Sequence, residues 1–237
     1  MLNEEKTEFF IASSSYHSKL LQHLTLTVGD AIITPSTSVR NLGVKFNSTM
    51  TMTKHVNSVC QSVNYHLRNL SLIRRYIDHD TCNAAARALI LSRLDYCNSL
   101  FNGLNQSDLK RLQRLQNKAA RLIYLQPMRA DATPLLQELH WLPVKQRIAF
   151  KTCTIMYKSL TNISPQYISQ SLDLSSPRRE GLRSKHNLNV PRTYKRDGDR
   201  AFSVAGPKIW NTLPTHIKNS PSMDRFGRLL KTHLFLY

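Results

Sequence analysis

One stretch near the middle of the chain, from Leu109 to Tyr124, constrains the fold more than any other. It reads LKRLQRLQNKAARLIY, and at about 100° per residue its apolar side chains fall on one face of a helix. Those apolar positions are Leu109, Leu112, Leu115, Ala119, Leu122 and Ile123. We therefore expect an amphipathic helix that buries this face against other helices.

The opposite face of this helix carries charges of one sign. It holds Lys110, Arg111, Arg114, Lys118 and Arg121 within an arc of about 100°, and the stretch contains no acid. Like charges on one helix face repel, whereas Glu–Lys pairs four residues apart attract. The pattern therefore indicates either a solvated face of unusual composition or a surface on which each cation neutralises a phosphate. Such contacts hold a phosphate backbone without reading its sequence.

The charge of the whole chain favours the second interpretation. Its 237 residues carry a formal net charge of +18, with a pI near 10.1. Residues 1–50 hold four basic and four acidic side chains, so the entire excess lies after residue 50. A balance of this kind indicates a polyanionic partner, with nucleic acid first and an anionic membrane surface second.

Several other classes of protein are excluded by what the sequence does not contain. The N-terminal segment is acidic and has no apolar core of a signal peptide, and no apolar run approaches the roughly 18 residues of a membrane span. The four cysteines (Cys60, Cys82, Cys97 and Cys153) lack the spacing of a zinc site or a disulfide framework. We expect reduced thiols in an intracellular protein of the cytoplasm or nucleus, with no membrane partner.

The first 50 residues have the composition of short strands. Segments 6–12 and 39–46 are each expected to form one strand, and segment 24–34 alternates around Gly29-Asp30 as a hairpin does. Three short strands form a small antiparallel sheet that is too small to fold alone.

After Asn47 the apolar period becomes helical, and the expected fold class is mainly α. A first helix capped by Thr51 or Thr53 buries Val56, Val59, Cys60, Val63, Leu67 and Leu70. A second spans 81–101, follows caps at Asp78 and Asp80, ends at Gly103, and is apolar enough for the centre of a bundle. The third, capped by Asn105 or Ser107, is the amphipathic helix described above, and a fourth spans 144–160 after Pro143.

Residues 175–200 are basic and poor in large apolar residues, so we expect a loop or arm there. Two short helices are expected to follow it, one over 201–210 and one from Ser222 with Phe226, Leu229, Leu230 and Leu234 on one side. The domains expected from these patterns are residues 1–50 (β), residues 51–164 (α-helical bundle) and residues 165–237 (basic C-terminal extension).

Three features resemble chemical sites, and each also has a structural interpretation. Asp95 is an isolated carboxylate in an apolar helix, and an arginine from a neighbouring helix is its natural partner. The motif Asp78-His79-Asp80 suggests a metal site but fits helix capping better. Trp141, within His140-Trp141-Leu142-Pro143, and Trp210 either stack on bases or fill space between helices, and we favour the second. No phosphate loop, nucleophile elbow or HExxH motif is present, so the residues alone indicate no enzyme.

Four longer segments resemble a known family. They are SRLDYCNSLFNGL, LKRLQRLQNKAARLI, TPLLQELHWLPVKQRIAFK and RAFSVAGPKIWNTLP. Together they are similar to the region that follows the polymerase palm in LINE-type (non-LTR) retrotransposon reverse transcriptases, in particular those of the Jockey and chicken-repeat group. The similarity extends over nearly the whole chain.

This resemblance implies roles for several residues. LNEEKTEFFI resembles the palm segment just after the catalytic aspartates, where Lys6 takes the place of a lysine near the incoming nucleotide. Leu42, Gly43 and Val44 match the core of the strand near the primer terminus. The helices after residue 50 would form the thumb and a C-terminal extension, which hold the template–primer duplex.

One departure from the family decides what the chain is expected to do. The paired aspartates that bind two catalytic metal ions would lie before Met1, and the chain contains no such motif. We therefore expect a truncated reverse transcriptase that binds RNA, DNA or their hybrid without catalysis. No cofactor is expected in this chain, since Mg²⁺ would belong only to the full-length polymerase.

The expected contacts to nucleic acid come from the helix at 109–124 and from the basic arm. They are Lys110, Arg111, Arg114, Lys118, Arg121, Arg178, Arg179, Arg183, Lys185, Arg192, Lys195 and Arg196. Two alternatives stay open: a non-catalytic helical remnant or adaptor that docks on an acidic protein partner, and an active polymerase if the chain is part of a longer product.

Overall fold

The structure, a computed structural model, describes the chain apart from residues 1–6, 14–20, 22, 173–186, 195 and 237, and apart from the side chains of 196 and 197. The chain forms two compact units, residues 1–61 and residues 62–237. The strands are β1 (Phe9–Phe10), β2 (Leu26–Val28), β3 (Ala31–Ile33), β4 (Pro35–Ser36), β5 (Ser38–Asn41) and β6 (Val44–Asn47).

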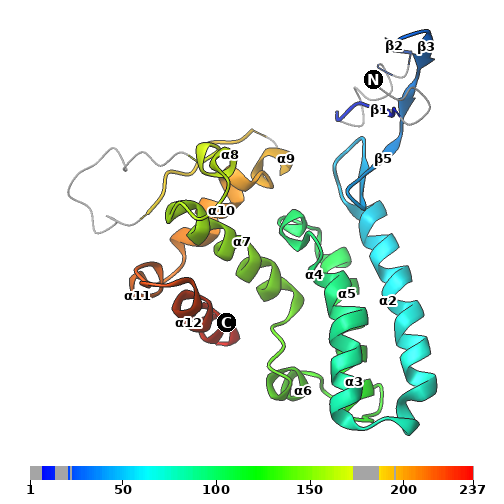
Figure 1. The fold of residues 1–237 in the computed structure, drawn as a ribbon, viewed down its shortest axis with the longest axis vertical. Helices are drawn as coiled ribbons and strands as arrows, with labels where there is room; N and C mark the ends of the chain where they lie inside the picture. The colour runs from blue at the N-terminus through cyan, green and yellow to red at the C-terminus, as the bar shows by residue number, and fades with distance from the viewer. Residues whose placement is uncertain (1–6, 14–20, 22, 173–186, 195, 237) are drawn as a thin grey trace. The chain divides into compact units, whose positions relative to one another are not determined.

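Helices make up most of the rest of the described chain (Figure 1). The α-helices are α2 (Thr53–Ile73), α3 (His79–Ala86), α4 (Ser92–Asp95), α5 (Gln106–Ile123), α6 (Thr133–Glu138), α7 (Val144–Leu160), α8 (Gln166–Gln170), α9 (Arg196–Asp199), α10 (Phe202–Asn211), α11 (Thr215–Lys218) and α12 (Met223–Phe235). Three segments have other helical geometry: η2 (Arg74–Tyr76) and η4 (Asn98–Phe101) are 3₁₀-helical, and η3 (Arg87–Leu91) is π-helical. The expected fold class, mainly α with a small N-terminal β region, is confirmed.

The strands of the first unit pair in twos. β2 and β3 form the predicted antiparallel hairpin, with Val28 opposite Ala31 and Gly29 in the left-handed conformation (φ 60°). The prediction of one strand over 39–46 is wrong, because β5 and β6 are two antiparallel strands joined at Leu42 and Gly43. Both joining residues have positive φ, which is the geometry of a tight hairpin turn. β1 and β4 pair in parallel.

The first turns of α2 complete the core of this unit. Val44, Met52 and Val56 are buried, and the backbone N–H of Lys45 donates to Nδ1 of buried His55 at 3.4 Å. Burial, with Lys45 nearby, lowers the pKa of His55. The imidazole therefore accepts this hydrogen bond in its neutral form.

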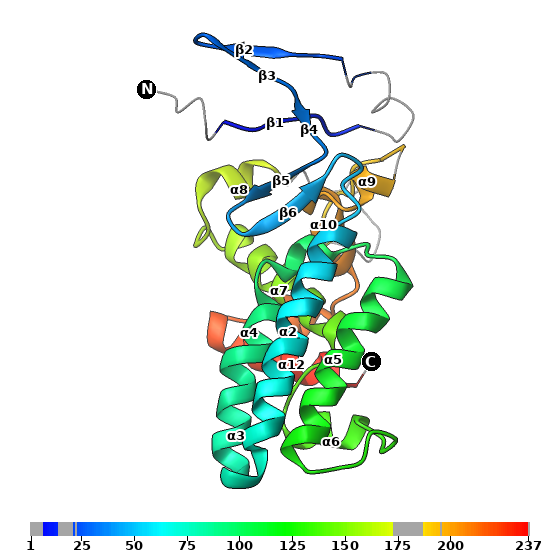
Figure 2. The same ribbon diagram turned by 90° about the vertical axis from the view of Figure 1, so that its right-hand side faces the viewer.

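In the second unit, α3, η3 and α4 follow one another along the chain, and α5 packs beside α3 and η3 (Figures 1 and 2). Of the six apolar positions predicted for the first helix, Val63, Leu67 and Leu70 are buried here, and Val56, Val59 and Cys60 are buried in the first unit. From the next two helices the buried residues include Cys82, Ala86, Ile90, Leu112, Leu115, Ala119 and Ile123. The fourth helix spans the predicted residues 144–160 as α7. The helical period in the sequence therefore identified this core correctly.

The expected continuous helix over 81–101 is interrupted twice. Its middle, η3, has the wider π-helical turn, and the chain leaves the helix at Tyr96, after which Cys97 takes a left-handed conformation (φ 50°). Leu89 is 38% exposed, so one side of this segment faces solvent and not the centre of a bundle. Asp78 does cap the segment, because its side chain accepts from the backbone N–H of Thr81 at 2.7 Å.

A second core joins α7 to the C-terminal helices. Buried side chains from the second half of α7 pack with Leu172 and with residues of α10, α11 and α12. Phe226 stacks between Tyr157, at 4.4 Å between ring centroids, and Trp210, at 5.8 Å. The two predicted C-terminal helices are present as α10 and α12, and Ser222, where the second was expected to begin, is the N-cap of α12. The C-terminal extension therefore contributes both of its predicted helices to a folded core.

Three helices of this unit end in the same way. Leu125, His140 and Asn162 each lie two residues beyond the last residue of α5, α6 and α7, with φ between 53° and 56°. The following backbone N–H returns to a carbonyl five residues earlier, as Trp141 does to Leu136 at 2.8 Å. This is the Schellman ending, in which glycine is the usual left-handed residue. None of these three positions is a glycine.

Candidate nucleic-acid interface

Helix α5 is built from local signals that the sequence makes plain. The side chain of Asn105 accepts from the backbone N–H of Asp108 at 2.7 Å, which identifies Asn105 as its N-cap. The buried face is centred slightly differently from the prediction, because Leu109 and Leu122 are only half-buried whereas Gln116 and Ala120 are buried. Gln116 tolerates burial because its Nε2 donates to the carbonyl of Leu142 at 2.9 Å.

The five basic residues of α5 divide into two groups. Arg111 forms an ion pair with buried Asp108 at 3.0 Å, and Nε of Arg121 donates to the carbonyl of Ala130 at 2.8 Å. These two side chains therefore stabilise the helix start and the turn after α5. Of the five basic residues, only the remaining three are therefore available to contact a partner.

Lys110, Arg114 and Lys118 are exposed and form no hydrogen bond or ion pair with any described residue. They follow one another every four residues, which places them about 6 Å apart along the helix axis. Their charges are not neutralised within the described part of the chain, so these three residues are the part of the predicted basic face whose charge is available to a partner. We refer to these three residues as the α5 row.

A groove beside the α5 row is also lined by Arg68, a residue that was not among the predicted contacts. It has a volume of about 400 Å³ and is lined by Lys118 and Arg121 of α5 and by Arg68 and Asn64 of α2. Arg68 is exposed, and its place on the helical period of α2 marks it only as solvent-facing. Sequence alone does not show which face of α2 meets α5, so it gave no signal for this neighbour.

The predicted residues of the basic arm are mostly outside the described residues. Arg178, Arg179, Arg183, Lys185 and Lys195 lie there, and so does the side chain of Arg196. Arg192 is described and exposed. The structure thus leaves their predicted contacts as predictions.

The residues implied by the family resemblance are divided in the same way. Lys6 lies outside the described residues. Leu42 and Gly43 form the β5–β6 turn, where Leu42 is exposed, and Val44 is buried beneath them. Their predicted proximity to a primer stays a prediction.

The structure decides between the alternatives for the other candidate residues. Trp141 and Trp210 are buried among helices, which favours the space-filling interpretation over base stacking. The hydrogen bond from Thr81, with smaller contributions that include Arg74, lowers the pKa of Asp78, as expected for a capping carboxylate. No group of three or more metal-ligating side chains occurs among the described residues.

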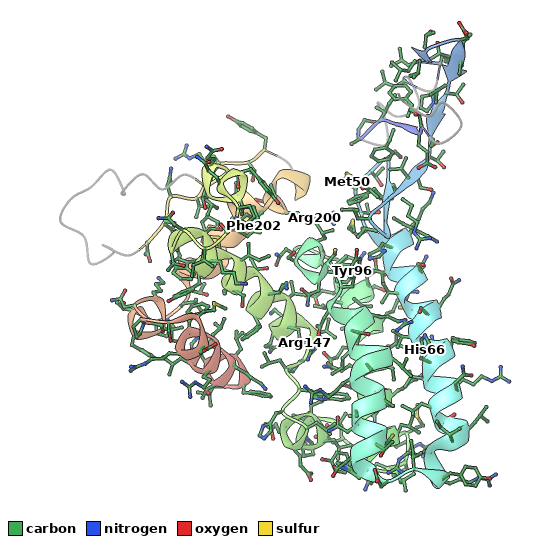
Figure 3. The ribbon with its side chains drawn as sticks, in the orientation of Figure 1. Met50, His66, Tyr96, Arg147, Arg200 and Phe202 are labelled. Atoms are coloured by element: carbon green, nitrogen blue, oxygen red, sulfur yellow. The ribbon has the colours of Figure 1, made fainter. Side chains whose placement is uncertain are left out.

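Asp95 has the partner that its sequence context predicted. Arg147, which lies on α7 and is labelled in Figure 3, donates through Nε to Oδ1 of Asp95 at 2.7 Å and also pairs with Oδ2. The side chains are 19% and 38% exposed, respectively. This bidentate pair joins α4 to α7 and indicates a structural role for the carboxylate.

Comparison with protein-family models, with curated protein sequences and with solved structures finds no match to this chain. No helix of the described residues is both long and apolar enough to cross a membrane.

Proposed function

We propose that this chain binds RNA, DNA or an RNA–DNA hybrid through the α5 row, as the thumb-like part of a LINE-type reverse transcriptase. The observation that carries the proposal is the row itself: Lys110, Arg114 and Lys118 are exposed, evenly spaced and free of acidic partners among the described residues. Each such cation releases condensed counterions when it neutralises a phosphate. Arg68, across the groove, extends the same charge onto α2.

The net charge indicates that the partner is a polyanion and not a molecule with a single acidic group. An excess of 18 positive charges, all of it after residue 50, creates a field that attracts a phosphate backbone at long range. The proposed place of action is the cytoplasm or nucleus, where RNA and DNA are found. The chain alone is proposed not to extend a primer, because it holds no paired aspartates for two-metal phosphoryl transfer.

The test is the salt dependence of binding, measured by fluorescence anisotropy with a labelled RNA–DNA hybrid. Between about 50 and 200 mM salt, log K should fall linearly with log salt. Replacing Lys110, Arg114 and Lys118 together by Glu should weaken binding and reduce the magnitude of the slope by about 2 to 3, since each phosphate contact contributes about 0.9.

A matched control removes the effect of net charge. Lys145, Arg225 and Arg228 are exposed on other helices, and their replacement by Glu changes the charge by the same amount. This control should retain a steeper slope than the α5 variant. Equal losses in both variants, or binding that ignores salt, would refute the α5 row as the interface. A protein partner that survives nuclease treatment in a pull-down would favour the adaptor alternative instead.

A further inference from the structure

A cavity of about 820 Å³ lies within the second unit, lined by α3, η3 and η4, by the α6–α7 region and by α12. None of the α5 row lines it. Its volume is within the range of small-molecule sites in proteins. The Asp95–Arg147 pair forms part of its wall, and a second hollow of about 510 Å³ shares Arg87, Leu91 and that pair.

The cavity wall contains buried acceptors that lack donors. Asn98 is 3% exposed, and its Nδ2 donates to Oδ1 of Asp95 at 3.3 Å, which fixes the orientation of the amide. Its Oδ1 is buried without a hydrogen-bond partner among the described residues, and the same is true of Oδ1 of Asn83. A buried acceptor without a donor is costly. A ligand that presents N–H groups would remove this cost.

The charges on the wall favour an anion. Four cations and two carboxylates line the cavity. Arg147 is paired with Asp95, whereas Arg87, Lys151 and Lys231 form no ion pair with any described residue. These three come from η3, α7 and α12, so they approach the cavity from different elements. The charge that remains available is therefore positive.

Flat rings complete the wall. His79 and Tyr124 lie with their ring centroids 4.9 Å apart, and Trp141 and Phe150 add apolar surface. Burial, together with a hydrogen bond to Glu138, raises the pKa of Tyr124, so its hydroxyl stays protonated at neutral pH. The rings of His79 and Tyr124 suit the stacking of a nucleobase, whereas Trp141 is buried and only contributes to the wall.

We propose that this cavity binds a nucleotide, with its phosphate held by Arg87, Lys151 and Lys231 and its base amino group donating to an unpaired asparagine oxygen. A nucleotide supplies a negative charge for the unpaired cations of this wall, a flat base for its aromatic rings, and N–H donors for its unpaired acceptors. The nucleotide is either a free mononucleotide or the unpaired end of a strand, because both present the same chemistry. The site is separate from the α5 row and extends the proposed function.

Isothermal titration of the full chain with AMP tests the proposal. Replacing Arg87 and Lys151 by Gln should weaken AMP binding about tenfold, since both side chains are exposed, form no ion pair with any described residue and would each lose a charge-assisted contact to the phosphate. The matched control replaces Lys145 and Arg228 by Gln. It also removes one lysine and one arginine from exposed helical positions, but neither residue lines the cavity, so the control should bind AMP as the unmodified chain does. Circular dichroism confirms that each variant is folded.

Three results would overturn the proposal: no AMP binding, equal binding of inorganic phosphate and AMP, or equal weakening in the control. The Glu variant of the α5 row should still bind AMP, so failure of the cavity and failure of the α5 row are distinguishable. A single-stranded RNA oligonucleotide that displaces AMP would identify the strand end as the ligand. AMP binding that persists with the oligonucleotide bound would identify the free nucleotide, and both of these results support a nucleotide site.

Discussion

The two halves of α7 have opposite surroundings. In its first half, Arg147, Phe150 and Lys151 line a cavity of about 820 Å³ whose wall holds unpaired buried acceptors. In its second half, Cys153 and Met156 are fully buried in the core shared with the C-terminal helices. α7 thus packs into the C-terminal core along its second half, which we call the closed half, and lines the cavity along one face of its first half, which we call the open half. Different residues of the same helix therefore contribute to stability and to the proposed ligand site.

The largest expected effect is in the closed half. Replacing Phe226 by Ala should lower the free energy of unfolding by about 3–5 kcal/mol, because it removes a fully buried ring between Tyr157 and Trp210. Urea denaturation measures this change. Tyr167, which is exposed, is the control, and its replacement by Ala should change stability by no more than about 0.5 kcal/mol. Similar small losses in both variants would show that the C-terminal core is not closely packed.

Two helical glycines test the same packing from the opposite direction. A Cβ added to Gly206 would lie 2.5 Å from Sδ of buried Met156, whereas a Cβ at Gly227 meets nothing within 4 Å. Gly227→Ala should raise stability by about 0.5–1 kcal/mol through helix propensity. Gly206→Ala should lower it by about 1–2 kcal/mol, since the new methyl group displaces the fully buried side chain of Met156. Thermal unfolding of both variants should give shifts of opposite sign, and shifts of the same sign would contradict close packing at Met156.

The open half should respond more weakly. Replacing Arg147 by Met leaves Asp95 without its cation and should cost about 1–2 kcal/mol, between the values for exposed and buried ion pairs, because both side chains are partly exposed. A double-mutant cycle with Asp95→Asn isolates the pair. A loss as large as that of Phe226→Ala would mean that the two halves of α7 contribute equally to stability.

The smallest effect depends on pH. Burial raises the pKa of Cys153 to about 12. The unfolded thiol ionises near pH 9, so the unfolded state loses its proton first and stability falls as the pH rises from about 9 to about 12. The stability of the unmodified chain relative to Cys153→Ser should therefore fall by about 1 kcal/mol between pH 8 and pH 10. A difference that does not change with pH would indicate that solvent reaches this end of α7.

Much of the fold was predictable because its helices carry strong local signals. The caps at Asp78, Asn105 and Ser222 and the buried period of α2 depend on residues within one or two turns of each other. The breaks were not predictable for the converse reason. Nothing in the Ala-rich segment before Asp95 marks a π-helical turn, and Cys97 is not a residue that favours the left-handed conformation.

The candidate site was predictable only in part. Helical geometry placed five cations of α5 on one face, but the carbonyl that binds Arg121 lies in the turn after the helix, and the pairing of Arg111 needed the orientation of Asp108. The partner of Asp95 was predicted by type, and only the packing of α4 on α7 identified it as Arg147. The cavity had no signal at all, since its wall is drawn from segments far apart in the chain.

The glycine-free endings of α5, α6 and α7 have a consequence for how this sequence can change. A left-handed residue other than glycine costs roughly 1–2 kcal/mol of stability. Leu125 adopts this conformation although its side chain is 67% exposed and gains little from packing. Replacement by glycine at that single position would recover part of that energy without altering the α5 row or the cavity. The sequence therefore retains a reserve of stability that an evolving lineage, or a protein engineer, can use to tolerate mutations elsewhere.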